Sequence, residues 1–434
     1  MVDSGLNCDI IVGQTLLDLA VLWKRETVLE LLLQAVDNID HHQLQNDQPG
    51  HKLRNVTRRR VILPCQVCPE AASDVRFLFS AGLRQAKDSS FPCYYFAREL
   101  VTFSLPPGLQ ALDNPLQKQL IEDVVDAHVQ SELEGEGVIN WNSEIVVTLA
   151  SRLYALNNRA AGDCLLDSVM QTVWGVTDRT NALRKAMALS LFEAESQFFS
   201  RWRNYETAFN DRLGLTLDES QWEAQWAQIL QLAAAQGSSL EHVHIFVLAH
   251  ILRRPIIVYA PAIVRSRVSG DKIGESSFQG VYLPLLWDRN FCHRSPIALA
   301  YTLGHFSALV AMQSDETPIE LQGSGDRAIY LPLQDHEGKF FRIHFWRPGS
   351  SSNASSSRRV LCDWLDCWKT CRTGTLVAQQ RLDAPPLPVR QMMIEWLARY
   401  EHEGMSSVVN VSNAIAGSSP VLSRQQPPPS PPPV

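Results

Sequence analysis

Helical patterns precede strand patterns along most of this chain, and that order constrains its fold more than any other feature. Residues 116–134, 142–156 and 181–235 have the apolar spacing that predicts helices. Short apolar runs that predict strands come later, at 256–259, 280–286, 297–301, 305–312, 328–333 and 340–346. Further helices are predicted at 360–372 and 388–401. Helices segregated from strands predict an α+β fold, a helix-rich domain with a small central sheet.

The length of 434 residues is too great for one ordinary core, so we expect more than one folded unit. The predicted division is an α-helical unit over 1–110, a main domain over 111–403 and a Ser/Pro-rich tail over 404–434. The composition of the tail predicts disorder. Its end, QQPPPSPPPV, is also typical of ligands for SH3 or WW domains.

Composition limits the classes of partner and compartment. A net charge of −7 argues against the broad basic surface of nucleic-acid-binding proteins. The chain contains no run of 18 apolar residues and no signal peptide at its start, so neither a membrane span nor secretion is expected. Nine irregularly spaced cysteines predict reduced thiols. We therefore expect the cytoplasm as the compartment, with the nucleus as the alternative.

The first hundred residues contain degenerate repeats. Residues 13–34 predict two short antiparallel helices, and Thr15 to Ala20 approximates the TPLHxA signature of an ankyrin repeat. Residues 70–86 predict a further helix that ends at Gly82. Two or three ankyrin-like units are the preferred interpretation, and an unspecialised helical domain is the alternative.

A metal site is not expected. Cys65 and Cys68 have the spacing of half a zinc site, but no second Cys/His pair follows at the spacing of a zinc finger. Neither a metal nor a cofactor is therefore predicted.

Cys164 is the candidate nucleophile. It follows a polar loop (157–163) and starts a helix that ends at Gly175, a residue suited to a left-handed cap. A helix N-terminus stabilises a thiolate, and its free N–H groups are suited to an oxyanion hole. Gly162 and Asp163 let the chain turn just before the cysteine and shape this oxyanion loop. The alternative is a buried structural cysteine.

His305 is the candidate base, because a nucleophilic cysteine needs an imidazole to accept its proton. It begins a strand directly after Gly304, whereas His242, His244 and His250 share one helix and suit packing or surface roles. A cysteine at a loop–helix junction with a later histidine on a strand is the layout of papain-like proteases.

Longer segments around these residues resemble the ovarian-tumour (OTU) family of deubiquitinases, and within it the A-twenty-like branch of the Trabid type. The resemblance covers residues 115–315 closely. It is carried by AAGDCLLDSVMQTVWGV, LRKAMALSL, LEHVHIFVLAHILRRPIIVY, GVYLPLLW and SPIALAYTLGHFSALVAM. It implies that Cys164 is the nucleophile and His305 the base of a cysteine protease that cleaves ubiquitin conjugates.

The resemblance also bears on a third catalytic residue. Many OTU enzymes orient the histidine with Asn or Asp two residues later, but that position is Ser307 here. In the A-twenty-like branch an acidic residue upstream of an Asn-Trp pair has this role, and the residue that matches before Asn140-Trp141 is Asp126. The alternatives are a solvated surface role for Asp126, with Asn140 or a backbone carbonyl as the orienting group.

The resemblance further implies ubiquitin and polyubiquitin chains as partners. The ankyrin-like unit would bind a distal ubiquitin and favour lysine-twenty-nine and lysine-thirty-three linkages, with lysine-sixty-three chains also cleaved. Candidate contacts are Leu16, Leu17, Leu29 and Leu32. The zinc fingers at the start of Trabid-type proteins have no counterpart in this sequence. The other interpretations are an inactive ubiquitin-binding scaffold and a hydrolase for a different ubiquitin-like modifier.

Overall fold

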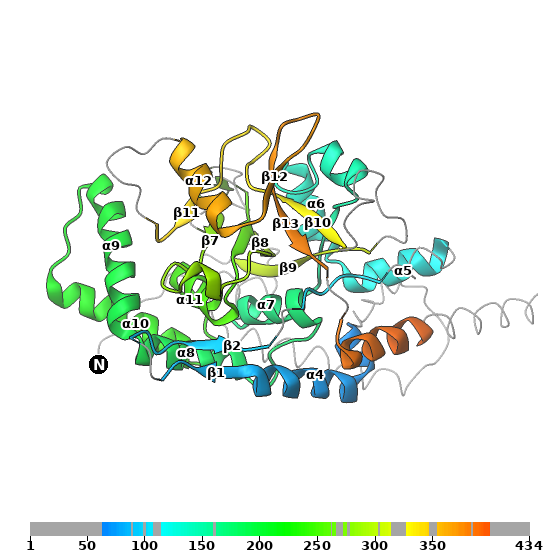
Figure 1. Ribbon diagram of the computed structural model, residues 1–434, viewed down its shortest axis with the longest axis horizontal. Coiled ribbons are helices and arrows are strands. Elements are labelled where there is room, and N and C mark those ends of the chain that lie inside the picture. Colours follow the sequence, from blue (N-terminus) through cyan, green and yellow to red (C-terminus); the bar gives the residue numbers. More distant parts are fainter. Residues whose placement is uncertain are drawn as a thin grey trace, which may run out of the picture. The chain divides into compact units, whose positions relative to one another are not determined.

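A six-stranded mixed sheet crosses the middle of the folded unit in the order β11-β7-β4-β8-β9-β3 (Figure 1). Strand β4 pairs in parallel with β8, and β11 pairs in parallel with β7, while the other pairs are antiparallel. A tight turn joins β8 to β9 and sets Thr302 opposite His305. The strands are β3 (Leu153–Ala155), β4 (Ile256–Tyr259), β7 (Gly280–Tyr282), β8 (Ile297–Thr302), β9 (His305–Ala311) and β11 (Ile343–His344).

This computed structural model places every residue it describes in one unit, whose first residue is Arg60. The described residues are 63–87, 90–98, 101–106, 114–158, 162–261, 263–265, 272–275, 278–302, 304–313, 327–346, 354–382 and 385–399.

Both faces of the sheet are buried, because successive side chains of a strand point to opposite sides. This explains why β4, β8 and β9 are continuous apolar runs instead of alternating ones. One face contributes Ile256, Val258, Ile297, Leu299, Phe306, Ala308 and Val310 to the larger hydrophobic cluster. The other face contributes Ile257, Tyr259, Ala298, Ala300, Leu309 and Ala311 to a second cluster.

Helices cover the first face. Figure 1 shows α7 (Cys164–Trp174) and α11 (His242–Leu252) beneath the sheet, with α8 (Ala182–Glu193) and α4 (Pro69–Gly82) farther out. Helix α7 ends at Gly175, whose φ of 70° confirms the predicted left-handed cap. Smaller elements on this side are α3 (Pro64–Val67), β1 (Leu83–Gln85), β2 (Tyr94–Phe96) and a helix over 387–399.

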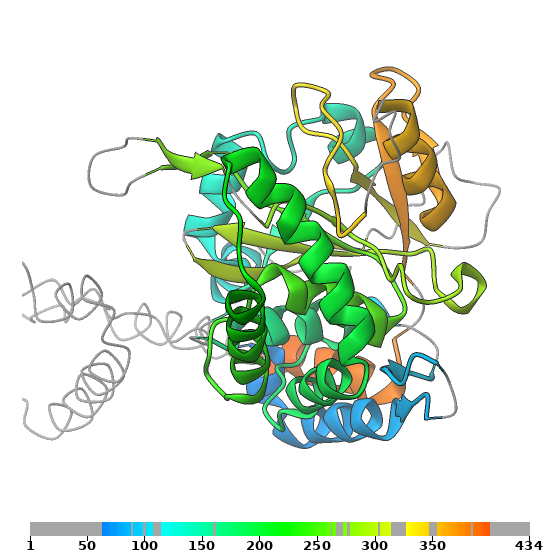
Figure 2. The ribbon, with the colours of Figure 1, turned by 90° about the vertical axis from the view of Figure 1, so that its left-hand side faces the viewer.

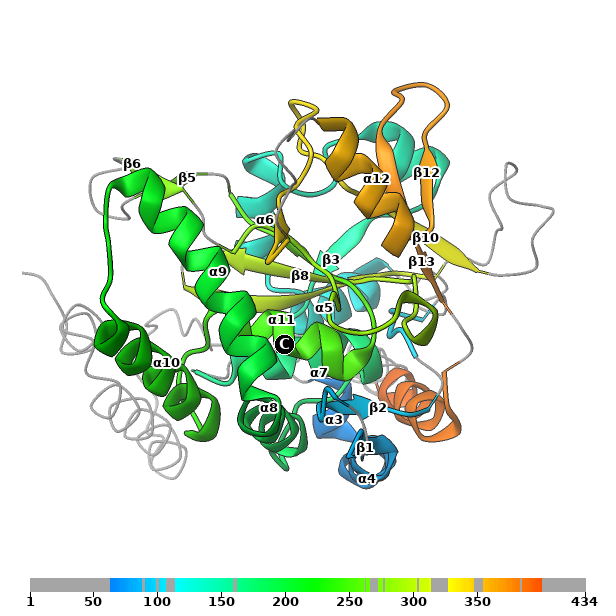
Figure 3. The same cartoon turned by 60° about the vertical axis from the view of Figure 1, so that its left-hand side comes forward.

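A smaller layer covers the second face (Figure 3). It consists of α6 (Ala127–Gly135), α12 (Ala354–Trp364) and a three-stranded sheet in the order β10-β13-β12. These strands are β10 (Ala328–Pro332), β12 (Cys367–Lys369) and β13 (Leu376–Arg381). Outside the sheets lie α5 (Asn114–Val124), the π-helix η2 (Glu144–Thr148) and the 3₁₀ turn η3 (Arg289–Phe291).

Two hairpins extend from this core. Helices α9 (Glu195–Leu213) and α10 (Glu219–Ala234) run antiparallel, joined by the ion pair of Arg203 with Glu219 at 2.6 Å. A two-stranded ribbon of β5 (Ile263–Arg265) and β6 (Lys272–Glu275) projects from the body in Figure 2.

Three predicted helices were wrong in part. The helix expected over 116–134 is broken into α5 and α6, because the backbone at Val125 and Asp126 pairs with Leu156 and Ala155 instead. The helix expected over 142–156 is the short η2 followed by the edge strand β3. The helix expected over 360–372 ends at Trp364, and β12 then pairs with β13.

The core of this unit reaches further toward the N-terminus than the predicted boundary at residue 110. Val75 and Phe79 of α4, together with Phe96 and Phe103, are buried in the same cluster as helix α7. The helix predicted over 70–86 is therefore present as α4, but it packs with the main domain. Residues 1–62, the ankyrin-like helices at 13–34 and the tail over 404–434 lie outside the described residues.

Candidate active site

Cys164 is the first residue of α7, as predicted, and its side chain is buried, with 7% of its surface exposed. The backbone N–H groups of Leu165 and Phe306 interact with its sulfur. Phe306 directly follows His305 on β9. The packing of α7 against β9 therefore brings the two predicted residues together, although 141 positions separate them in the sequence.

The thiol of Cys164 is not held as a thiolate. Burial is the largest influence and raises its pKa above the ordinary value for cysteine, and the negative charge of Asp167 also raises it. The N–H groups of Phe306 and Leu165 lower the pKa, but by less. The helix N-terminus was expected to stabilise the thiolate. Its effect is smaller than that of burial, which penalises the charged sulfur more strongly.

His305 has its imidazole fixed by the backbone. Its Nε2 lies 2.8 Å from the carbonyl oxygen of Asn158. A carbonyl can only accept, so Nε2 carries the hydrogen and Nδ1 has the free lone pair. Burial lowers the pKa of His305, while the Asn158 carbonyl and the charge of Asp126 raise it. The imidazole is therefore neutral at rest and suited to accept a proton at Nδ1.

Asn158 connects the two reactive residues, and the sequence analysis missed it. Its side-chain Nδ2 donates to the carbonyl of Cys164 at 2.8 Å and to Oγ of Ser168 at 3.0 Å. The same nitrogen lies 3.4 Å from the carbonyl of Phe306. A single buried residue thus links α7, β9 and the imidazole. The only signal for it in the sequence is an asparagine within the polar loop before Cys164.

Asp126 lies in the gap between α5 and α6 as the N-cap of α6. Its Oδ1 accepts from the backbone N–H groups of His128 and Val129, both at 3.1 Å. Its charge also acts on His305, whose pKa it raises. Within the described residues its hydrogen bonds serve the helix cap, and the hydrogen bond of the imidazole goes to Asn158. Asp126 therefore acts on the pKa of His305 through its charge.

Neither Asn140 nor Ser307 takes part in the hydrogen bond of the imidazole. Asn140 holds the edge strand, since its side chain bonds both the N–H and the carbonyl of Leu153 at 2.9 Å. Ser307 is buried on β9, and its hydroxyl has no hydrogen-bond partner among the described residues. The backbone carbonyl considered from the sequence is the group that bonds His305, and it belongs to Asn158.

Gly162 and Asp163 shape the loop before the nucleophile. Gly162 has a φ of 73°, and a Cβ there would collide with the carbonyl of Gly237. The carboxylate of Asp163 accepts from the N–H of Gly237 at 3.1 Å and pairs with Arg184 at 2.7 Å. These contacts fix the loop to the segment between α10 and α11.

Comparisons with known proteins agree with this geometry. Residues 159–306 match the family of OTU-like cysteine proteases. The chain carries an OTU-like cysteine protease domain. It is 45% identical over 392 residues to the ubiquitin thioesterase trabid of Drosophila melanogaster, a match that covers 90% of this chain and 47% of that protein. The chain therefore spans about half the length of this relative.

A solved structure of the OTUD1 OTU domain is also similar. It is 14% identical and covers 41% of this chain and 97% of that chain, with a TM-score of 0.20. The papain-like architecture of the OTU domain is inferred from the elements of this chain. Helix α7, which begins at Cys164, packs against strand β9, which begins at His305.

Three aromatic side chains pack together near Cys164. Phe278, Tyr301 and Phe306 lie with ring centroids 4.4 to 5.2 Å apart. Burial raises the pKa of Tyr301, and the charge of Cys164 raises it further.

Other histidines of the OTU domain have structural roles. His244 and His250 are fully buried, and burial lowers their pKa to about 4 and about 3. His244 bonds the carbonyl of Ile229, while His250 bonds the carbonyl of Phe246 and accepts from the N–H of Leu286. These neutral rings are packing residues, as the sequence suggested.

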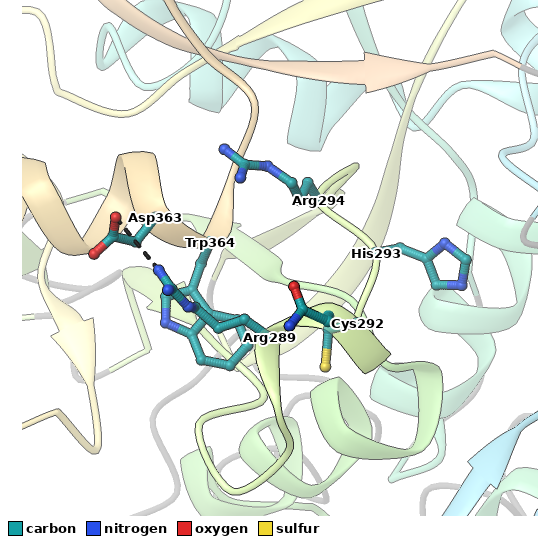
Figure 4. Close-up of a pocket in the computed structure, with 7 residues that line it drawn as sticks. Arg289, Cys292, His293, Arg294, Asp363 and Trp364 are labelled. Carbon is teal, nitrogen blue, oxygen red and sulfur yellow. Dashed lines mark ion pairs between the residues drawn. The ribbon is translucent and has the colours of Figure 1, made fainter.

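A polar hollow of about 370 Å³ lies apart from this site (Figure 4). Arg289 on its wall pairs with Asp363 at 3.4 Å, and Arg294 pairs with Asp366 at 2.6 Å. These arginines precede β8, whose opposite end meets His305. The hollow is therefore at the other end of the sheet, and its charges are compensated.

Several predictions concern other parts of the chain. Leu16, Leu17, Leu29 and Leu32 lie outside the described residues. Within the described ranges, no three His, Cys, Asp or Glu side chains are placed to hold a metal. Among the helices that the structure describes, none has the length and apolarity that crossing a membrane requires.

The raised pKa of Cys164 predicts the pH dependence of its alkylation. Because only the thiolate reacts, the rate at Cys164 should still be rising above about pH 8.5, the pKa of free cysteine. Mass spectrometry of the Cys164 peptide after timed treatment with iodoacetamide measures this rate. A rate that is already constant at neutral pH would contradict the account.

The position of Asp126 predicts a limited effect of Asp126→Asn. Asparagine can still cap α6, and the Asn158 carbonyl still fixes the tautomer, so only a charge is lost. We expect kcat to fall by about tenfold, far less than the roughly 10⁴-fold loss that accompanies a wrong tautomer. The acid limb of the pH–rate profile should move to lower pH, because Asp126 raises the pKa of His305.

Two results would count against this interpretation of Asp126. A loss near 10⁴-fold would mean that the carboxylate itself fixes the tautomer. An unchanged kcat with an unchanged acid limb would mean that Asp126 serves only the helix.

Proposed function

We propose that this chain is a thiol-dependent deubiquitinase that hydrolyses the isopeptide bond between the C-terminal glycine of ubiquitin and a lysine. One observation carries the proposal: Cys164 at the start of α7 lies against the backbone of Phe306, beside an imidazole held with Nδ1 free. The name of the Drosophila relative, a ubiquitin thioesterase, supports ubiquitin as the substrate.

The proposed reaction is acyl transfer through Cys164. Since the resting thiol is protonated, Nδ1 of His305 removes its proton as the sulfur attacks the glycine carbonyl. His305 then protonates the leaving lysine amine, and water hydrolyses the resulting thioester. The Asn158 carbonyl accepts the Nε2 hydrogen throughout and stabilises the imidazolium that forms transiently.

The loop and helix around Cys164 supply the oxyanion hole. The first N–H groups of α7 have no partner within the helix. Gly162 and Asp163 fix the loop that leads into these N–H groups. In the proposed complex they face the carbonyl oxygen of the bond that the sulfur attacks. Donors held in place in this way stabilise the negative charge that develops on the carbonyl oxygen.

Ubiquitin bearing a C-terminal electrophile tests this proposal. The wild-type chain should form a covalent adduct at Cys164, and Cys164→Ala should form none while keeping its melting temperature. His305→Ala should lower the labelling rate. An adduct at another cysteine, or none with the wild type, would refute the assignment.

An inactive ubiquitin-binding scaffold is the second candidate, favoured by the raised pKa of Cys164. It predicts that ubiquitin binds without forming an adduct, so the same probe separates the two functions.

Finer properties are proposed on the sequence resemblance alone. They are a preference for lysine-twenty-nine and lysine-thirty-three linkages with lysine-sixty-three chains also cleaved, an N-terminal ankyrin-like unit that binds a distal ubiquitin, and cytoplasmic or nuclear localisation. Docking of the Pro-rich tail on an SH3 or WW domain is a further proposal of this kind.

A further inference from the structure

Arg184 is a buried cation next to the catalytic loop. It belongs to α8, and only 2% of its surface is exposed. Its guanidinium pairs with the carboxylate of Asp163, where Nε lies 2.9 Å and Nη2 lies 2.7 Å from Oδ1. Its remaining hydrogen bonds go to the backbone carbonyls of Gly162, Leu232, Ala233, Ala235 and Ser238.

Two of these partners directly precede the nucleophile. Asp163 is the N-cap residue of α7, and its carboxylate also accepts from the N–H of Gly237. The carbonyl of Gly162 lies 3.3 Å from Nη2 of Arg184. The backbone just before Cys164 is thus held from one side by a single guanidinium.

The other partners end helix α10. The carbonyls of Leu232 and Ala233 lie in its last turn, and Ala235 is its C-cap residue. These carbonyls have no partner within the helix, and a cation there interacts favourably with the helix dipole. Arg184 therefore joins the end of the α9–α10 hairpin to the loop that carries Cys164.

We propose that Arg184 is a positioning residue for the reaction, which holds the oxyanion loop through Asp163 and Gly162 and anchors that loop to the end of α10. The proposal rests on the deubiquitinase function proposed above. Arg184 touches neither reacting residue, so its effect is on the placement of the loop N–H groups. Lysine cannot replace it, because an ammonium has three donors and no planar fork.

The test is Arg184→Lys, measured as kcat per active site, with sites counted by the ubiquitin probe. We expect a fall of about 10²-fold, the scale associated with a displacement of about 1 Å at a reacting group. KM should change much less, because the loop acts on the transition state. Counting only labelled sites excludes unfolded protein from the result.

Arg254→Lys is the matched control. Arg254 is also fully buried and donates to the carbonyls of Val101, Ser295 and Pro296. It lies before β4, near the end of β8 that is remote from His305. This variant should lower the melting temperature while kcat per labelled site stays unchanged.

Asp163→Asn is a second variant in case Arg184→Lys does not fold. It keeps an acceptor for Arg184 but removes the charge, so we expect a smaller fall in kcat, about fivefold, since charge-assisted hydrogen bonds are roughly twice as strong as neutral ones. An unchanged kcat per labelled site in both variants would overturn the role of Arg184 and leave the proposed function intact. A wild-type chain that the probe does not label would overturn the proposed function itself.

Discussion

The hydrogen bond from Nε2 of His305 to the carbonyl of Asn158 determines which nitrogen of the imidazole can act as a base. Because the acceptor is a backbone carbonyl, the tautomer does not depend on the ionisation of a side chain. The side chain of the same asparagine bonds the carbonyls of Cys164 and Phe306. The placement of Cys164 and His305 thus depends on one residue that follows the edge strand β3.

In the proposed mechanism, this arrangement lets a buried thiol act as the nucleophile. Burial disfavours the thiolate of Cys164, and burial also disfavours the imidazolium of His305. The neutral pair is therefore the resting state, and charge develops only as the proton moves from sulfur to Nδ1. Asp126 and the N–H groups around Cys164 oppose these effects of burial without reversing them.

Parts of the fold that depend on local pattern were predictable from the sequence. The strands β4, β8 and β9 are apolar runs in the chain, and α7 has both its Cys164 start and its Gly175 end in the pattern. The break at Asp126 and the strand β3 were missed, because both are set by pairing with segments distant in the sequence. Asp126 nevertheless has the residue type of an N-cap, which is a signal for that break.

In the candidate site, too, some features were predictable from the sequence and others were not. Cys164 and His305 could be proposed from the sequence because each begins an element after a glycine-containing turn, a placement that the structure confirms. The carbonyl of Asn158 could not be proposed in this way, since every residue has one and only the fold selects it. The neutral thiol also could not be foreseen, because the burial of Cys164 depends on packing between segments that are distant in the sequence.

The tautomer of His305 is the central claim, and ¹⁵N NMR of the imidazole nitrogens tests it directly. The protein is labelled with ¹⁵N at its histidines, and the signals of His305 are assigned by their loss in His305→Gln. The account predicts a protonated Nε2 and an unprotonated Nδ1 of His305 at neutral pH. A protonated Nδ1, or an imidazolium with both nitrogens protonated at that pH, would contradict it.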